Sequence, residues 1–344
     1  MKILVTGGAG YIGSTVTGLL TEKGHKLFVY DNLSHGRRDL LPAGAQLIDG
    51  ELGDRAHLER VFTGMVGSQA AGTHEPFDAV LHFAALIEAG ESMQRPEIYF
   101  RNNTASTLSL LEAMLTCGVK RLVFSSTAAV YGEPESIPIQ EDARLVPTNA
   151  YGQSKLLVEQ MLTWLHRIHG LQYASLRYFN VAGAAEGPEG IVRGESHEPE
   201  THLIPLVLDA AAGEREFVNI YGTDYETPDG TCLRDYVHVL DIARAHISAL
   251  PKLGPAGMRS YNIGTGTAYS VRQVCDSVEK VVGLKVPVRL APRRPGDPGS
   301  LCADPRRIKE ELGWIPRDSS LEGIISSAWQ WKQRHRARPA AMST

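Results

Sequence analysis

A tyrosine and a lysine four residues apart, Tyr151 and Lys155, are the side chains in this sequence best suited to acid–base chemistry. On a helix, such a pair shares one face. A free tyrosine has a pKa of about 10, and lowering it by roughly 3 pH units to make a base at neutral pH takes about 4 kcal/mol. A nearby ammonium group favours the phenolate, so Lys155 acts in the required direction. Taken alone, the spacing is more typical of an exposed helix pair, so the interpretation depends on the segments that precede it.

A threonine hydroxyl lies ahead of this pair, at the end of an apolar segment. Thr127 closes the run Ser125-Ser126-Thr127, which follows residues that predict a strand. From a strand end, the Thr127 hydroxyl can reach Tyr151 or a substrate oxygen. We therefore expect Thr127 to take part in the same chemistry.

The chain begins with a glycine-rich turn between an apolar strand and a helix, and the turn contains Gly7, Gly10 and Gly13. Gly7 permits the tight turn, Gly10 lets the backbone approach a pyrophosphate, and Gly13 lets the helix pack closely on the sheet. Free N–H groups at the helix start and the helix dipole favour phosphates. A glycine pattern alone is weak, but a position after a strand and before a helix is the context that a dinucleotide site requires.

An aspartate ends the second strand, and it indicates which dinucleotide binds. Asp31 stands 18 residues after Gly13. A carboxylate there accepts hydrogen bonds from ribose hydroxyls and repels a 2′-phosphate, so NAD is favoured over NADP. The positively charged nicotinamide would also favour the phenolate of Tyr151. Two alternatives stay open: Arg37-Arg38 could hold a phosphate, and Asp31 with Asn32 could simply start a turn.

The first half of the chain alternates strand-like and helix-like segments. Continuous apolar strands indicate burial on both faces, which predicts an α/β fold with a Rossmann-type, doubly wound parallel sheet. Ligands of such sheets lie at the carboxyl ends of the strands. The expected strands are Ile3–Thr6, Leu27–Tyr30, Gln46–Ile48, Ala79–Phe83, Leu122–Ser125 and Tyr173–Tyr178. The expected helices include Ile98–Cys117 and Ser154–Ile168.

The character of the sequence changes near residue 181, where a smaller α/β domain is expected to begin. Gly183–Pro199 is rich in Gly, Glu and Pro and predicts a loop. Two later helices have start signals, Ser270 with Gln273 and Asp304 with Pro305 at the first helical position. Further strands are expected at Glu216–Tyr221 and Val286–Leu290. We expect an NAD-binding domain over residues 1–180, with 234–250 returning to it, and a mainly substrate-binding domain over residues 181–340.

The composition of this 344-residue chain limits its partners. The net charge of -4 argues against a nucleic-acid surface, and no apolar run approaches the ~18 residues of a membrane span. The N-terminus is too soon broken by glycine for a signal peptide. Four cysteines without a CxxC pair predict reduced thiols in a cytoplasmic protein. His197, His202 and His238 show no metal-ligand spacing, so no metal is expected.

Together and in this order, the residues resemble the extended short-chain dehydrogenase/reductase superfamily and, within it, the UDP-glucose 4-epimerases (UDP-galactose 4-epimerases). The resemblance covers nearly the whole chain. The stretches that carry it are Val5–Gly13, Tyr30–Asn32, His82–Ala85, Gly90–Ser92, Phe124–Gly132, Tyr151–Lys155, Leu176–Asn180, Gly230–Val239 and Ala291–Asp297.

The resemblance implies reversible 4-epimerisation of UDP-glucose and UDP-galactose, with the hydride held on tightly bound NAD. Tyr151 would take the proton of the sugar 4-hydroxyl while hydride leaves C4, and the 4-keto sugar would turn over in the pocket before both return. Thr127 would hydrogen-bond the 4-oxygen, and Lys155 would hold the nicotinamide ribose. One acid–base group serves both directions, so no metal or added redox partner is required.

The resemblance also implies two sets of binding residues and a homodimer. Those expected to bind NAD are Gly7, Gly10, Tyr11, Ile12, Gly13, Asp31, Asn32, Glu51, Leu52, Phe83, Ala84, Asn103, Lys155 and Tyr178. Those expected to bind the UDP-sugar are Thr127, Tyr151, Asn180, His202, Leu203, Arg234, Arg294, Asp297 and Leu301. Arginine suits a diphosphate because its planar fork binds oxygens bidentately. The dimer would pair apolar helices around Leu108–Leu115 and Leu156–Leu165, unless those faces only cover the sheet of their own subunit.

The sequence departs from the family pattern at four places. Ile87 stands where several members carry a lysine that contacts NAD, and Glu51-Leu52 replaces a common Asp-Ile pair beside the adenine. Thr201-His202 replaces an Asn-Asn pair near the substrate. Leu301 falls where members carry either tyrosine or a smaller residue beside C2 of the sugar. Leucine is intermediate in size, so acceptance of N-acetylated sugars stays open.

Three other functions also stay open. A UDP-glucuronate or UDP-pentose 4-epimerase would share every catalytic residue. A 4,6-dehydratase usually carries an Asp-Glu pair directly after the threonine, whereas Ala128-Ala129 follow Thr127 here. A non-catalytic NAD sensor could use the same fold, although such proteins often lose the tyrosine or the lysine, and both are present.

Overall fold

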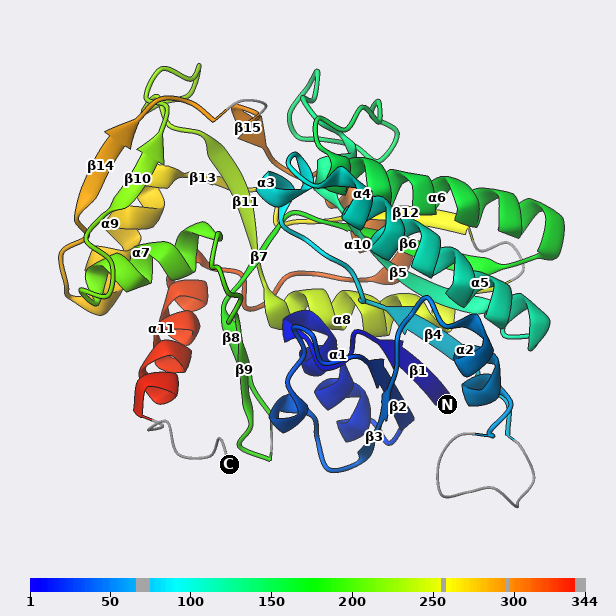
Figure 1. Cartoon of the computed structure of the whole chain (residues 1–344). Helices are drawn as coiled ribbons and strands as arrows, with labels where there is room; N and C mark the ends of the chain where they lie inside the picture. The colour runs from blue at the N-terminus through cyan, green and yellow to red at the C-terminus, as the bar shows by residue number, and fades with distance from the viewer. Residues whose placement is uncertain (66–74, 188, 255–257, 295–296, 338–344) are drawn as a thin grey trace.

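The apolar segments of the first half form one parallel sheet in the computed structural model, which describes residues 1–65, 75–187, 189–254, 258–294 and 297–337 (Figure 1). The sheet has seven strands in the order β12-β6-β5-β4-β1-β2-β3, and each neighbouring pair is parallel. Its strands are β1 (Lys2–Thr6), β2 (Lys26–Asp31), β3 (Ala45–Asp49), β4 (Ala79–His82), β5 (Arg121–Thr127), β6 (Gln172–Tyr178) and β12 (Met258–Ile263). The predicted fold class is confirmed.

Helices cover both faces of this sheet because the strand side chains alternate between two cores. In β1, Ile3 and Val5 face one core, whereas Leu4 faces the other. On the first face lie α1 (Tyr11–Glu22) and α8 (Val239–Ala249). On the second lie α2 (Arg55–Phe62), α5 (Ser106–Thr116) and α6 (Ala150–His169). Shorter elements are η1 (Arg38–Leu40), α3 (Ala89–Ser92), η3 (Ala128–Val130), η4 (Leu250–Lys252) and α10 (Arg306–Leu312).

The helix expected over residues 98–117 is interrupted. The segment consists of α4 (Pro96–Tyr99), a π-helical stretch η2 (Phe100–Ala105) and α5. The π-helical stretch carries the buried Asn103, whose amide accepts a hydrogen bond from the Leu86 N–H (2.8 Å) and donates one to the Leu86 carbonyl (2.9 Å). These two bonds fix the loop after β4 to this helix, and π-helical turns are frequent at functional sites.

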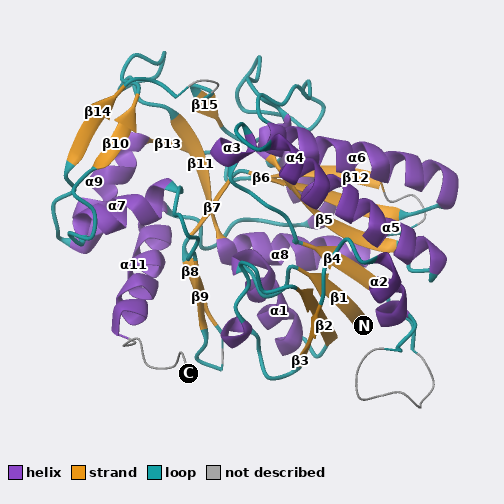
Figure 2. Cartoon of the chain, viewed as in Figure 1, coloured by secondary structure: helices purple, strands orange, loops and turns teal. Residues whose placement is uncertain are grey.

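A second lobe lies beside the carboxyl ends of the central strands (Figure 2). It contains a four-stranded sheet of β7 (Asn180–Ala182), β11 (Leu233–His238), β13 (Ala268–Ser270) and β15 (Ser300–Leu301). A parallel pair is formed by β10 (Val218–Tyr221) and β14 (Val288–Ala291). Helices α7 (Leu203–Ala211), α9 (Val271–Val282) and α11 (Leu321–Ala337) pack around a core of their own. In the described part of the chain, no helix is both long and apolar enough to cross a bilayer.

Two local expectations were wrong. The predicted loop over Gly183–Pro199 contains an antiparallel pair, β8 (Ala184–Glu186) with β9 (Val192–Gly194). The Gly-rich and Glu-rich composition hid this pair, whose alanines are buried. Helix α10 begins at Arg306, one residue later than expected, with Pro305 at the N-cap position. The cause is the Asp304 carboxylate, which accepts a hydrogen bond from the Arg306 N–H (3.1 Å) and so makes a turn before the helix.

Two elements that come late in the sequence belong to the first lobe in space. Helix α8 packs on α1, and β12 pairs with β6 at the edge of the central sheet. By contrast β11, which directly precedes α8, pairs with β7, β13 and β15. The division at residue 180 with a return over residues 234–250 stays a prediction, and residues 338–340 of the expected second domain lie outside the described residues. The capping box predicted at Ser270 and Gln273 is present.

Candidate active site

A cavity of about 370 Å³ lies at the carboxyl ends of the central strands, where ligands of doubly wound sheets bind. It brings together residues from the start of the chain, from β5 and from α6. The predicted site residues that line it are Gly7, Gly10, Tyr11, Ile12, Gly13, Asp31, Asn32, Glu51, Leu52, Phe83, Ala84, Thr127, Tyr151, Lys155, Tyr178, Asn180 and His202. Ile87, one of the departures from the family pattern, also lines it.

The glycine turn closes tightly against the loop after β4. Gly7 has a φ of +70°, and a Cβ there would lie 2.4 Å from the backbone nitrogen of Ala84. A Cβ on Gly13 would lie 2.2 Å from the Gly7 carbonyl oxygen, so both positions exclude a side chain. At Gly10 the nearest contact would be 3.4 Å, so the absent side chain at Gly10 leaves room above the turn. This arrangement fits a pyrophosphate lying over the start of α1.

Asp31 is buried at the end of β2, and both of its carboxylate oxygens are engaged. They accept hydrogen bonds from the N–H groups of Ala9 and Leu33, both at 2.9 Å. Burial raises the pKa of Asp31, and these bonds lower it in part. The turn-forming role is therefore real, and a carboxylate still has lone pairs for ribose hydroxyls. Arg37, considered for a phosphate, binds Asp39 through two nitrogens at 3.1 and 2.7 Å.

Helix α6 presents the acid–base pair because its first turn packs directly on η3. The Asn149 side chain caps the helix by accepting a hydrogen bond from the Gly152 N–H (2.8 Å). A Cβ on Gly152 would lie 2.5 Å from the Ala129 carbonyl oxygen, so only glycine allows this approach. The close contact brings Tyr151 near Thr127, whose hydroxyl lowers the pKa of the phenol.

The electrostatics of the pair differ from the expectation. Desolvation raises the pKa of Tyr151 to about 12, although the bond with Thr127 lowers it in part. Burial lowers the pKa of Lys155 to about 7, and its Nζ donates a hydrogen bond to the Ser125 carbonyl oxygen (2.9 Å). The expectation included the positive charge of the nicotinamide. In the chain by itself desolvation disfavours the charged form of both groups, so the lowering of the tyrosine pKa stays a prediction.

A histidine far along the sequence supports the inner wall of the cavity. His246, on α8, is hydrogen-bonded to the Tyr178 hydroxyl (2.5 Å), and its ring lies 4.7 Å from that of Phe83. Burial lowers the pKa of His246 to about 4, so the imidazole is neutral. Sequence reasoning missed this residue, since its segment carries no local motif.

A second cavity, of about 220 Å³, continues from the first and contains the predicted nucleotide-sugar residues. Asn180 and His202 line both cavities. The remaining predicted residues in the second cavity are Leu203, Arg234, Arg294 and Asp297. It also contains residues that sequence reasoning missed, among them Arg215, Asn219 and Tyr221.

Within this cavity the charged residues are partly paired. Arg234 forms a hydrogen-bonded ion pair with Asp297 and donates to the Leu233 carbonyl oxygen (2.8 Å). The guanidinium of Arg294 stacks 4.0 Å from the centre of the Tyr221 ring. Three arginines, Arg215, Arg234 and Arg294, line this cavity, and they suit a ligand with a diphosphate.

His202 is held by a neighbouring glutamate. Its backbone N–H and its Nδ1 both lie 2.8 Å from Oε1 of Glu200. Burial opposes protonation, but Glu200 and Glu195 outweigh it and raise the pKa of His202 to about 9. The imidazole at the junction of the two cavities is therefore positively charged near neutral pH.

Two predicted site residues line neither cavity. Asn103 is buried and is hydrogen-bonded to Leu86 and to Ser154 (3.1 Å). It therefore supports Leu86, which lines the first cavity, without lining the cavity itself. Leu301 packs against the small apolar cluster that contains Phe179 and Ala303. Its separation from both cavities weakens the expectation that it limits the sugar.

The comparisons with known proteins identify the family. A family model described as the NAD dependent epimerase/dehydratase family matches residues 3–264. A UDP-glucose 4-epimerase of Streptomyces lividans is 48% identical over 334 residues, which cover 97% of either chain.

Solved structures give the same result over nearly the whole length. The crystal structure of UDP-glucose 4-epimerase from Brucella ovis in complex with NAD matches with a TM-score of 0.88 at 42% identity, over 96% of this chain and 98% of that one. The enzyme from Bifidobacterium longum, in complex with NAD+ and UDP, matches with a TM-score of 0.89 at 36% identity, over 98% and 99%. This chain belongs to the NAD dependent epimerase/dehydratase family.

Proposed function

We propose that this protein is an NAD-dependent UDP-glucose 4-epimerase that interconverts UDP-glucose and UDP-galactose through a transient 4-keto sugar. One observation carries the proposal: the cavity that joins the glycine turn to Thr127, Tyr151 and Lys155 continues past Asn180 into an arginine-lined cavity. A nucleotide cofactor and a nucleotide sugar can therefore meet at one tyrosine. The names and ligands of the relatives support the same activity.

The NAD site follows from the glycine turn and the residues around it. NAD, when bound, accepts the hydride from C4 of the sugar and gives it back. Gly7, Gly10 and Gly13 admit the pyrophosphate over the start of α1, and Asp31 offers its remaining lone pairs to the adenosine ribose. Phe83 and Tyr178 form the inner wall, which His246 holds in place.

Tyr151 moves the proton at the sugar 4-oxygen. Its raised pKa keeps the phenol protonated in the chain alone, and this is the form that returns a proton to the sugar. A positive charge beside the ring favours the phenolate that removes the proton. Thr127 lowers the pKa of the same phenol, so it favours the phenolate that removes the proton. The amine of Lys155 is fixed by Ser125 near this pair.

The second cavity holds the UDP part of the substrate. Arg234 and Arg294 suit the diphosphate, with Asp297 beside Arg234 and Asn180 at the junction with the first cavity. His202 adds a positive charge where the two cavities meet. This places the sugar at the junction, between the diphosphate and Tyr151.

The activity is tested with purified protein and no added cofactor. UDP-galactose is supplied, and UDP-glucose is followed through a coupled UDP-glucose dehydrogenase; the assay is repeated with the N-acetylated substrate. We expect turnover with resident NAD. Turnover of UDP-glucuronate or a UDP-pentose alone would overturn the choice of sugar, and bound NAD without any turnover would favour a sensor.

Tyr151→Phe tests the mechanism. We expect turnover to fall at least about 100-fold while NAD content and the fold are kept, because only the proton-transferring hydroxyl is removed. Tyr261→Phe is the control, since the Tyr261 hydroxyl bonds Glu311 (2.8 Å) outside both cavities. Near-wild-type turnover in Tyr151→Phe would sink the assignment.

We also propose that the protein is a cytoplasmic homodimer that associates through α5 and α6. Both helices leave large apolar side chains exposed, among them Leu108, Trp164 (62% exposed) and Ile168 (68% exposed). Trp164 and Ile168 lie one turn apart on α6 and so share a face. The four cysteines are free thiols, which suit a reducing compartment such as the cytoplasm.

A further inference from the structure

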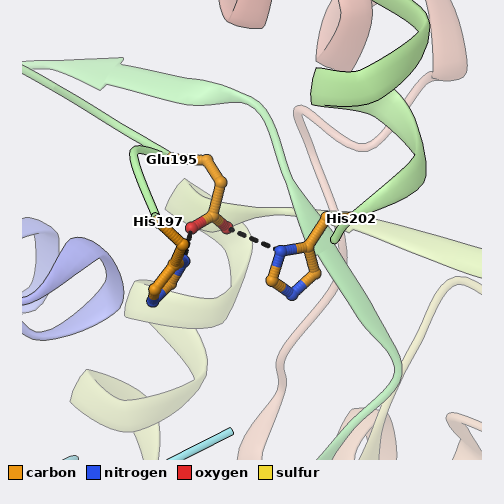
Figure 3. Close-up of side chains that lie close together, drawn as sticks. All are labelled: Glu195, His197 and His202. Carbon is orange, nitrogen blue, oxygen red and sulfur yellow. Dashed lines mark hydrogen bonds and ion pairs between the residues drawn. The ribbon is translucent and has the colours of Figure 1, made fainter. Parts of the chain in front are cut away.

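Three side chains that sequence spacing did not relate to a metal come together at the edge of the active-site cavity (Figure 3). They are Glu195, which follows β9, and His197 and His202, which precede α7. Each offers one ligand atom, and these atoms all lie within 4.8 Å of one another. The three residues line both the cavity that contains Tyr151 and an adjoining cavity of about 470 Å³.

The carboxylate lies between the two imidazoles, as Figure 3 shows. Nδ1 of His197 is hydrogen-bonded to Oε1 of Glu195, and Nδ1 of His202 lies 3.9 Å from Oε2. The two ring centres are 5.6 Å apart. Zinc bonds of about 2.0–2.2 Å hold two donors on one ion roughly 3.5 Å apart. Small side-chain rotations therefore suffice to place all three donors around one ion.

Neighbouring residues hold Glu195 and His202 in place. The indole N–H of Trp331 donates to the Glu195 carbonyl oxygen (2.9 Å), and a Cβ on the preceding Gly194 would lie 2.4 Å from the same indole. Oε1 of Glu200 holds His202 through the backbone N–H and through Nδ1 of the ring, both at 2.8 Å. Because this bond occupies Nδ1, the ring nitrogen that also faces Glu195, it must be exchanged for the bond to an ion.

We propose that Glu195, His197 and His202 bind one divalent cation of the borderline class, of which Zn²⁺ is the type. Two imidazoles and one carboxylate form a ligand set that zinc uses, and three protein ligands leave a coordination position open. The cavities on both sides give an ion access to that position. The site shares His202 with the proposed substrate cavity, and a bound ion would replace the proton of His202 while keeping a positive charge there.

The test is a calorimetric titration of Zn²⁺ into the purified full chain, produced without a histidine tag and stripped with a chelator. We expect one Zn²⁺ per chain, and at least tenfold weaker binding in His197→Ala and in Glu195→Gln. His169→Ala is the matched control, because that histidine is exposed at the end of α6, and its binding should equal wild type.

A second measurement separates loss of the site from loss of the fold. Without metal, the variants should melt as wild type does, whereas excess Zn²⁺ should raise the melting temperature of wild type and His169→Ala only. Absence of Zn²⁺ binding by wild type would overturn the proposal. Equal binding by wild type and His197→Ala would do so too, since the ion would then sit on other donors, such as the free thiols.

Discussion

At the scale of single residues, burial sets the charge state of the lysine beside Tyr151. The folded pKa of Lys155 is about 7, below its ordinary 10.5, because burial disfavours the charged amine. Between these values the unfolded chain binds more protons than the folded one, so stability rises with pH. The contribution is present above the unfolded pKa and is lost as the pH falls through about 7.

Lys155→Met removes this titration. Between pH 7 and pH 9 we expect wild type to gain on the order of 2 kcal/mol in free energy of unfolding over the methionine variant, because one pKa unit corresponds to about 1.4 kcal/mol. Urea unfolding at the two pH values, at equal NAD content, measures the gain. The same change with pH in both proteins would show that the buried amine is not the titrating group.

The site residues that could be predicted are those with a local pattern. Tyr151 and Lys155 show helical spacing, and Gly7 and Asp31 occur at the ends of apolar segments. Arg215, Tyr221 and His246 were missed because only the tertiary fold brings them to the cavities. The raised pKa of Tyr151 could not be predicted from the sequence either, because desolvation depends on which groups surround the phenol in the folded chain.

At the scale of elements, the first turn is held by steric limits that a single methyl group would break. Gly7→Ala places a Cβ 2.4 Å from Ala84 and forces a φ of +70° on a residue with a side chain. Gly24→Ala imposes a similar φ, +75°, but its Cβ would meet no atom of the described residues within 4 Å. The pair therefore separates backbone strain from collision.

We expect Gly24→Ala to cost about 1 kcal/mol of stability with full NAD content, because left-handed backbone disfavours a side chain. Gly7→Ala should cost more and should lower the NAD content of the purified protein. Cofactor absorbance and denaturant unfolding measure the two effects. Full NAD content in Gly7→Ala would show that the turn tolerates the methyl group.

The close contact between α6 and η3 leads to a second prediction. Gly152→Ala would push α6 away from Ala129 and separate Tyr151 from Thr127, so we expect at least a tenfold loss of turnover with NAD retained. Gly90→Ala in α3 is the control, because its Cβ would meet nothing within 4 Å. Equal turnover in the two variants would contradict the proposed role of this contact.

The elements that departed from expectation did so for tertiary reasons. The helix over residues 98–117 contains a π-helical stretch because Asn103 is tied to Leu86 across the loop after β4. The β8–β9 pair is stabilised by packing on α11, which its own composition does not reveal. Periodicity detects strands and helices, whereas such interruptions depend on partners far along the chain.

At the scale of the whole molecule, the exposed apolar face of α6 predicts self-association. Trp164→Glu places a charge in the proposed dimer contact, where burial of an unpaired carboxylate is unfavourable. We expect the variant to be a monomer by light scattering at concentrations where wild type is a dimer. Leu290→Glu, at an equally exposed apolar residue of β14 in the other lobe, should stay dimeric. A dimeric Trp164→Glu variant would show that the dimer forms through another surface.

The return of β12 and α8 to the central sheet has a consequence for synthesis on the ribosome. When residue 180 has been made, β6 is still an open strand edge, and the face of α1 that α8 covers is still bare. Open edges and bare apolar faces invite association between nascent chains. The sheet that holds the cofactor turn is complete only after residue 263 has left the exit tunnel. The central sheet therefore cannot be completed before most of the second lobe has been synthesised, and a chain that stalls midway leaves this edge and this face uncovered.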